Sequence, residues 1–182
     1  MIDAARLDAA LAATWPAAET AACGPFTLRF GPGGNRVSAA TLEAARATTA
    51  EIDAAIAAMG ARGQVPLFRV RMHESDLDAA LAGLGFAPVH DTMFLVAPTG
   101  TVAAHPVPPL TAFDIWPPLA IQRALWAADG IGADRCAVMA RTEGAKTALL
   151  GRFDGRPTGA GFVAVAGDVA MVHALTVPAA DR

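Results

Sequence analysis

Four histidines are the side chains best suited to proton transfer in this chain: His73, His90, His105 and His173. Two of them stand directly before a carboxylate residue, in the pairs His73-Glu74 and His90-Asp91. A metal site needs further ligands at a suitable spacing, and neither pair has a third. We therefore expect a solvated loop at 73–74 and an exposed pair on a strand at 90–91.

The other two histidines differ in their surroundings. His105 lies in a proline-rich stretch, where we expect it to be exposed. His173 lies in an apolar run that is expected to form a strand, and an imidazole there would titrate near neutrality. The alternative for His173 is a polar residue that flanks the core. The sequence contains no Gly-x-Ser-x-Gly elbow, no phosphate-binding loop and no Cys-x-x-Cys pair.

Composition excludes several classes of protein. The 182 residues are 54% apolar and 17% charged, with a formal net charge of −3, so the chain can bury a core and has no basic surface for nucleic acid. No apolar run approaches the roughly 20 residues of a membrane span, and Met1 to Thr14 does not resemble a signal peptide. Cys23 and Cys136 are expected to be unpaired thiols. We expect a soluble, cytoplasmic protein without nucleic-acid or membrane partners.

The first half of the chain alternates helical and strand patterns. Asp3 is a candidate cap for the first helix, which Trp15-Pro16 ends. Thr48 or Thr49 caps the second, and Ser75 caps a third that ends at Gly85. The expected helices cover 3–14, 48–61 and 75–85, and the expected strands cover 26–30, 36–40, 66–70 and 89–96.

A stretch without periodicity separates this half from the second. Residues 98–110 contain four prolines and a glycine, which is typical of a linker. Beyond it we expect helices at 118–128 and 133–141 and strands at 146–153, 158–165 and 169–177. The Asp154-Gly155 dipeptide between two apolar runs favours a hairpin. The pattern predicts an α+β or three-layer α/β/α protein with domains at 1–97 and 111–182.

Two stretches carry a resemblance to a known family. Leu-Ala-Gly-Leu-Gly-Phe-Ala-Pro-Val-His-Asp-Thr-Met-Phe-Leu-Val (81–96) resembles the last helix and closing strand of a GNAT-superfamily N-acetyltransferase. Residues 151–165, with their Asp-Gly turn, and residues 168–182 resemble the second, third and fourth strands of such a domain. Trp-Pro-Ala-Ala-Glu (15–19) is similar to the N-terminal unit of tandem members. The resemblance implies a degenerate N-terminal GNAT-like domain, a linker and the N-terminal half of a catalytic GNAT domain.

The resemblance implies direct transfer of an acetyl group from acetyl-CoA to a primary amine of a small molecule or peptide. The fourth strand would pair with the pantetheine arm at Leu175, Thr176 and Val177. Arg182 would begin the pyrophosphate loop, whose two glycines do not follow. Gly31-Pro32-Gly33-Gly34 lacks a following helix and does not replace them. We therefore expect a chain that stops before this loop and is inactive alone, or a non-catalytic binding or assembly module.

The same resemblance gives further residues a role. His173 occupies a place near which the family often has a glutamate base, and is a candidate general base. The usual general acid is a tyrosine, and this chain has none. Trp116 and Trp126 lie on or beside a helix that borders the acceptor pocket, although core packing is the default. The strand at 169–177 would be an open apolar edge, so we expect missing downstream residues, a partner chain such as a second copy in a homodimer, or coverage by the N-terminal unit. Surface charges are expected at Arg152 and Arg156.

Overall fold

A computed structural model describes residues 2–181. Within that range the chain is an α+β protein with six α-helices and two antiparallel sheets. It divides into two compact units, which are described separately below: unit 1 comprises Met1–Ala18, Gly31–Val37 and Val107–Arg182, and unit 2 comprises Glu19–Phe30 and Ser38–Pro106. These units are assembled from non-contiguous segments, whereas the sequence-based division placed contiguous domains at 1–97 and 111–182. The sequence-based assignment of a GNAT-like domain to each of the ranges 1–97 and 111–182 stays a prediction.

Unit 2 is built on a small antiparallel sheet with strand order β1-β2-β3. Its strands and helices are β1 (Glu19–Cys23), β2 (Phe26–Phe30), β3 (Thr41–Leu42), α2 (Thr49–Ala61), α3 (Ser75–Gly83) and α4 (Thr99–Ala103). In β2 the alternation of apolar and polar residues buries Phe26, Leu28 and Phe30 on one face. These three side chains pack with apolar residues of α2 and α3, among them Ile52 and Leu77, to form the core of the unit.

The caps of the unit 2 helices show how local chemistry fixes their ends. Thr48, one of the two caps that the sequence allows, caps α2 through a capping box in which its main-chain N–H donates to Glu51 at 2.7 Å. These hydrogen bonds from Thr48 hold the pKa of the Glu51 carboxyl below its ordinary value. The cap expected at Ser75 is wrong by one residue, because Ser75 is already helical and Glu74 stands at the N-cap without a side-chain cap hydrogen bond.

Three strands expected between 36 and 96 do not form as predicted. Residues 35–37 make a short 3₁₀ helix, η1 (Asn35–Val37), and the returning strand starts only at Thr41. The segment 66–70 contributes a single parallel bridge, Ala40 to Phe68. Residues 89–96 lie in no helix or strand of the described chain. The preference of a segment for strand conformation depends on its own residues. A strand also needs a neighbouring strand to pair with, and a short stretch of sequence does not show whether one is present.

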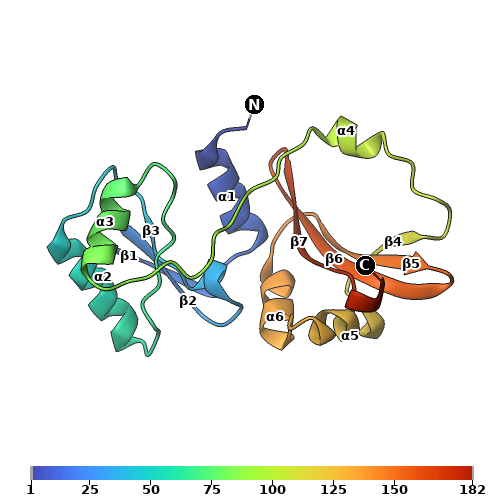
Figure 1. The fold of residues 1–182 in the computed structure, drawn as a ribbon. Coiled ribbons are helices and arrows are strands. Elements are labelled where there is room, and N and C mark those ends of the chain that lie inside the picture. Colours follow the sequence, from blue (N-terminus) through green and yellow to red (C-terminus); the bar gives the residue numbers. More distant parts are fainter. Residues whose placement is uncertain (1, 182) are drawn as a thin grey trace. The chain divides into compact units, whose positions relative to one another are not determined.

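Unit 1 carries the larger sheet, with strand order β4-β5-β6-β7 and antiparallel pairing throughout (Figure 1). Its elements are α1 (Ala4–Thr14), β4 (Ala112–Ile115), α5 (Ala120–Ala128), α6 (Ala133–Arg141), β5 (Lys146–Phe153), β6 (Arg156–Ala166), β7 (Val169–Thr176) and the terminal 3₁₀ turn η2 (Ala179–Asp181). The hairpin at Asp154-Gly155 is confirmed, with positive φ at both residues. The strand β4 was not predicted.

One face of this sheet is covered by helices. Ala160, Phe162 and Ala164 of β6 alternate onto that face and share one core cluster with residues of α1, α5 and α6. α1, which begins at its predicted cap Asp3, contributes Leu11 and is followed by the buried Trp15. The helix at the start of the chain therefore closes the core of the last sheet. On the opposite face, Val165, Val172 and Leu175 have exposed side chains.

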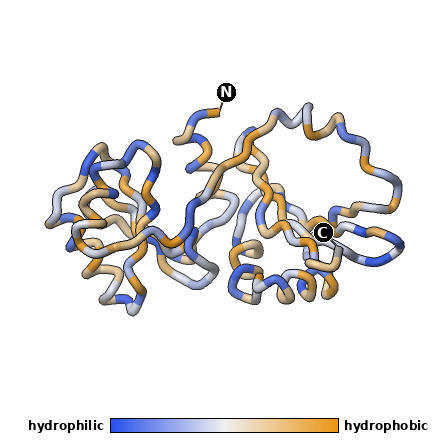
Figure 2. Tube along the Cα trace, viewed as in Figure 1, coloured by the Kyte–Doolittle hydropathy of each residue, from blue (hydrophilic) through white to orange (hydrophobic). Residues whose placement is uncertain are grey.

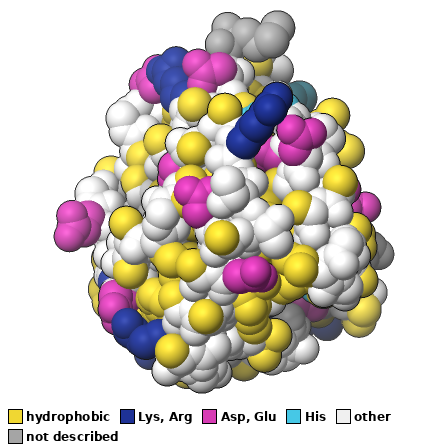
Figure 3. All heavy atoms as spheres, turned by 90° about the vertical axis from the view of Figure 1, so that its left-hand side faces the viewer, with side chains coloured by type: hydrophobic (Ala, Val, Ile, Leu, Met, Phe, Trp, Pro, Cys, Tyr) yellow, Lys and Arg dark blue, Asp and Glu magenta, His cyan; other side chains and the backbone are white. Residues whose placement is uncertain are grey.

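The chain has fewer basic than acidic residues, with 14 Lys and Arg against 17 Asp and Glu. On the face drawn in Figure 3, Lys and Arg side chains lie apart from one another, each close to an Asp or Glu side chain. Among residues 2–181, none of the helices has both the length and the apolar character that a membrane crossing requires.

Candidate functional site

β7 is interrupted by a bulge at the residues that the sequence singled out. Phe162 of β6 faces His173, and Ala160 faces Thr176, so one residue of β6 stands opposite two residues of β7. At the bulge Ala174 takes a φ of +49°, a conformation that costs an L-residue about 1 kcal/mol. Trp126 holds it there, because its indole Nε1 donates to the Ala174 carbonyl oxygen at 2.8 Å. Bulges of this kind re-aim side chains and end regular pairing.

His173 is buried on the helix-covered face, where only 3% of its surface is exposed. Its Nδ1 lies 3.3 Å from Arg36 Nη1, and its Nε2 lies 2.9 Å from Thr14 Oγ1. Arg36 can only donate, so Nδ1 accepts and Nε2 carries the hydrogen. The hydroxyl of Thr14 then donates to the Ala10 carbonyl oxygen at 2.7 Å. This network assigns the neutral Nε2–H tautomer to His173.

The electrostatics agree with this assignment. Burial, and secondarily the charge of Arg36, lower the pKa of His173 to about 4. Its ring also lies against Trp15, with the ring centroids 4.9 Å apart. The lone pair that a general base would use is the one that faces Arg36. This geometry favours the alternative in which His173 is a polar link between α1 and the sheet, and its role as a base stays a prediction.

The three expected cofactor-pairing residues lie at the end of β7, which stops at Thr176, one residue earlier than predicted. Leu175 is 70% exposed and lies over Gly161, where an added Cβ would come within 3.3 Å of it. Thr176 is buried and donates to Asp129 Oδ2 at 2.5 Å. Val177 follows the strand and is half-buried. Arg182 lies outside the described residues.

The outer edge of β7 is open to pairing in the described chain. β7 lies at the edge of the sheet in the described chain, and an edge strand can pair with the amide groups of an extended ligand. Gly159 and Gly161 of β6 let β7 approach closely, because an added Cβ would lie 3.2 Å from the Thr176 carbonyl oxygen and 3.3 Å from the Leu175 side chain. Within residues 2–181, β7 leads only into the short turn η2. The loop at Gly31 to Gly34 leads into η1, so it offers no α-helix N-terminus to a pyrophosphate.

The two tryptophans near α5 have different environments. Trp126 is fully buried in the core of unit 1, which confirms the default expectation for it. Trp116 is about one-third exposed, lies against Phe162, and has Lys146 Nζ 4.7 Å from its ring centroid. The ammonium of Lys146 also donates to carbonyls at the end of α6, including Ala140 at 2.6 Å. Lys146 thus connects α6 to the start of β5.

The remaining candidates do not converge on a metal or nucleophile site. Among the described residues, no group of three or more His, Cys, Asp or Glu side chains could hold a metal ion. His73, His90, Asp91 and His105 are exposed. Both cysteines are free, and burial raises the pKa of the Cys136 thiol. Arg152 and Arg156 flank the β5–β6 turn, where Arg152 donates to the Gly155 carbonyl oxygen at 3.2 Å.

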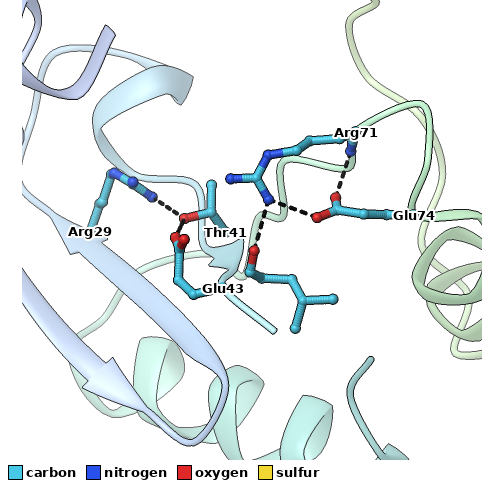
Figure 4. Close-up of polar contacts among 6 residues, drawn as sticks. Arg29, Thr41, Glu43, Arg71 and Glu74 are labelled. Atoms are coloured by element: carbon cyan, nitrogen blue, oxygen red, sulfur yellow. Dashed lines mark hydrogen bonds and ion pairs between the residues drawn. The ribbon is translucent and has the colours of Figure 1, made fainter. Parts of the chain in front are cut away.

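The solvated loop expected at 73–74 is wrong for Glu74, which is buried in a polar network of unit 2. Its carboxylate is buried and accepts from Arg71 twice, from Nη1 at 2.7 Å and from the main-chain N–H at 2.6 Å (Figure 4). The same Nη1 donates to the Leu42 carbonyl oxygen at 2.7 Å. In the neighbouring residue, the Thr41 hydroxyl accepts from Arg29 at 2.8 Å and donates to Glu43 at 2.6 Å. Two arginines therefore fix the short strand β3 on both sides.

No protein-family model, curated protein or solved structure matches this chain.

Proposed function

We propose that unit 1 is the acetyl-CoA-binding part of a GNAT-like N-acetyltransferase that modifies a primary amine. The observation that carries the proposal is the bulged edge strand β7, which ends a sheet built in the order strand, two helices and three antiparallel strands. The exposed Leu175 and the outer edge of β7 would receive the pantetheine arm as an added strand. Thr176 and Val177 would continue this pairing.

Unit 2 is proposed to be the degenerate partner domain of a tandem, three-layer arrangement. Its helix α2 follows β3 and returns the chain to the parallel bridge at Ala40 and Phe68. A helix N-terminus in this place could bind a phosphate. In unit 2 the carboxylate of Glu51 already accepts from Thr48 at that N-terminus, which supports a role other than cofactor binding.

Acetyl-CoA, when bound, would supply a thioester whose carbonyl carbon is attacked by a neutral amine. The C–N bond forms, the C–S electron pair leaves with the CoA thiolate, and the proton lost by the amine is balanced by protonation of that thiolate. The contribution of this chain is to hold the arm in an extended form along β7. Leu175 would contact the arm, while the carbonyl oxygen of Ala174 is held by Trp126. His173 keeps the strand in place from the covered face through Thr14 and Arg36.

A second candidate is a non-catalytic module that binds extended chains at the same edge. The observation that favours it is the environment of His173, whose Nδ1 lone pair accepts from Arg36 and whose pKa is lowered to about 4. With that imidazole engaged, the amine would need another proton acceptor. Unpaired Cys23 and Cys136 fit a reducing compartment, and we propose a cytoplasmic location for either function.

Titration of the purified chain with acetyl-CoA in a thermal-shift and calorimetric assay tests the proposal. A ligand at 100 times its dissociation constant stabilises the folded state by about 2.7 kcal/mol. Leu175→Asp should weaken binding about tenfold, because the change removes an apolar contact and places a carboxylate beside a polyanion. Phe153→Asp is the matched control, since Phe153 is similarly exposed on β5. The absence of any stabilisation at millimolar acetyl-CoA would refute cofactor binding by this chain.

Thiol release in the presence of a panel of primary amines separates the two candidates. If the protein is an acetyltransferase, the rate of CoA release should depend on which amine is added and should be lower in the Leu175→Asp variant. If it is a non-catalytic binding module, no CoA should be released with any amine tested.

A further inference from the structure

Residues 89–96 of unit 2 form an exposed apolar segment. Five of its eight residues are large and apolar, and all five are exposed; Met93 and Leu95, for example, are 82% and 89% exposed. The hydropathy colouring of Figure 2 turns orange along this stretch as it approaches α4. A run of exposed apolar side chains is a common feature of association sites.

The backbone of this segment also lacks partners. Within residues 2–181, no main-chain group of residues 87–97 takes part in a backbone hydrogen bond, and no strand includes them. The sequence nevertheless favours a strand, because Val89, Thr92 and the run from Met93 to Val96 are residues that sheets prefer, with no glycine or proline between Pro88 and Pro98. The segment thus has the composition of a strand but no strand partner in the described chain.

In unit 1, β7 is an edge strand that could accept a further strand. It pairs with β6 alone in the described chain, and it bears exposed Val172 and Leu175. Such an edge offers a row of main-chain donors and acceptors to another strand. It is eight residues long, which matches the eight residues of 89–96 and corresponds to about 27 Å of strand.

We propose that residues 89–96 of one copy of the chain pair with β7 of a second copy. In the proposed dimer the exchange is reciprocal, since each copy supplies one such segment and receives the segment of the other at its own β7. The pairing forms main-chain hydrogen bonds along both edges and buries the apolar side chains of both segments. This association uses the edge along which we propose that acetyl-CoA binds, so acetyl-CoA and dimer formation compete.

Cysteine cross-linking between two distinguishable copies tests the pairing. Both native cysteines, Cys23 and Cys136, are first replaced by serine. One tagged copy then carries Met93→Cys, a second copy with another tag carries Leu175→Cys, and a short bis-maleimide is added to the mixture. A covalent heterodimer is expected, because the pairing brings these positions together. Met72→Cys in place of Met93→Cys is the matched control, since Met72 is fully exposed outside the segment.

Light scattering and a strand-breaking variant supply the second measurement. The full chain should be a dimer at micromolar concentration, and Thr92→Pro should make it monomeric without lowering its melting temperature, because Thr92 lies in the exposed segment. A monomeric parent chain, or cross-linking only within one copy that carries both cysteines, overturns the proposal. Neither experiment requires acetyl-CoA, so its result is independent of the proposed function. If both proposals hold, acetyl-CoA lowers the yield of heterodimer.

Discussion

The indole Nε1 of Trp126 donates a hydrogen bond to the main-chain carbonyl oxygen of Ala174, 2.8 Å away, where β7 bulges. A buried helix residue thus fixes the irregular point of an edge strand. The bulge separates His173, which faces the covered side of the sheet, from Leu175, which is exposed. Two residues apart in a regular strand would share a face. The contact with Trp126 therefore stabilises the bulge that places Leu175 on the exposed face of the sheet.

We expect Trp126→Phe to lower the free energy of unfolding by about 2 kcal/mol, since the Ala174 carbonyl loses its partner in a buried setting. The aromatic ring keeps most of the packing. Urea denaturation measures the loss. Trp116→Phe is the control, because the partly exposed Trp116 packs at the edge of the same core, and it should cost less than about 1 kcal/mol. Equal losses in the two variants would contradict the role assigned to the Trp126 hydrogen bond.

The environment of His173 makes the stability of unit 1 depend on pH. Its pKa is about 4 in the folded chain and about 6.5 in an unfolded one. Between these values the unfolded chain binds the proton more readily. The stabilisation is therefore complete above about pH 6.5, falls as the pH decreases toward 4, and then levels off. The full change amounts to about 3 kcal/mol.

The measurement is the free energy of unfolding from urea titrations between pH 4 and 8. His173→Gln should remove this part of the slope, and His105→Gln, at an exposed site, should retain it. If the His173→Gln profile runs parallel to that of the parent chain, the imidazole does not carry the pH dependence.

Local chemistry explains which elements could be predicted. Asp3 and Thr48 cap their helices through side-chain hydrogen bonds to residues three positions away, and the Asp154-Gly155 turn requires only two residues. All three features depend only on residues close together in the sequence, so the sequence alone predicts the two helix starts and the turn. The failed expectation at 89–96 concerned a strand, whose formation depends on a partner that such a window does not contain.

The candidate site shows the same limit. The sequence placed His173, Leu175 and Thr176 on one strand, and that is confirmed. It did not indicate that Thr14, 159 positions from His173, would engage the imidazole. It also gave no sign of the bulge, because Ala174 has no feature that favours positive φ. Contacts with residues distant in the sequence determine which face of the sheet each side chain lies on and how His173 is protonated. These contacts are visible only in the structure.

The assignment of α1 to unit 1 predicts how a core substitution spreads. Leu11 of α1 packs in the cluster that contains Phe162 of β6. Leu11→Ala should therefore destabilise unit 1 by about 3 kcal/mol, through lost burial and the cavity that remains. Hydrogen exchange should become faster in β6 and β7, and rates in β2 and α2 of unit 2 should stay the same. Faster exchange confined to unit 2 would contradict the grouping of α1 with the C-terminal sheet.

The ion pair between Arg71 and Glu74 should be essential to unit 2 (Figure 4). The side chain of Glu74 is 5% exposed, so Glu74→Gln removes the charge that balances Arg71 in a buried place. Removal of one partner from such a pair costs about 3 kcal/mol. Urea denaturation followed by hydrogen exchange in β2 and α3 locates the loss. Glu19→Gln, which breaks the exposed pair of Glu19 with Arg62, should leave stability nearly unchanged. A Glu74→Gln protein as stable as the Glu19→Gln control would show that the buried pair contributes nothing beyond a surface one.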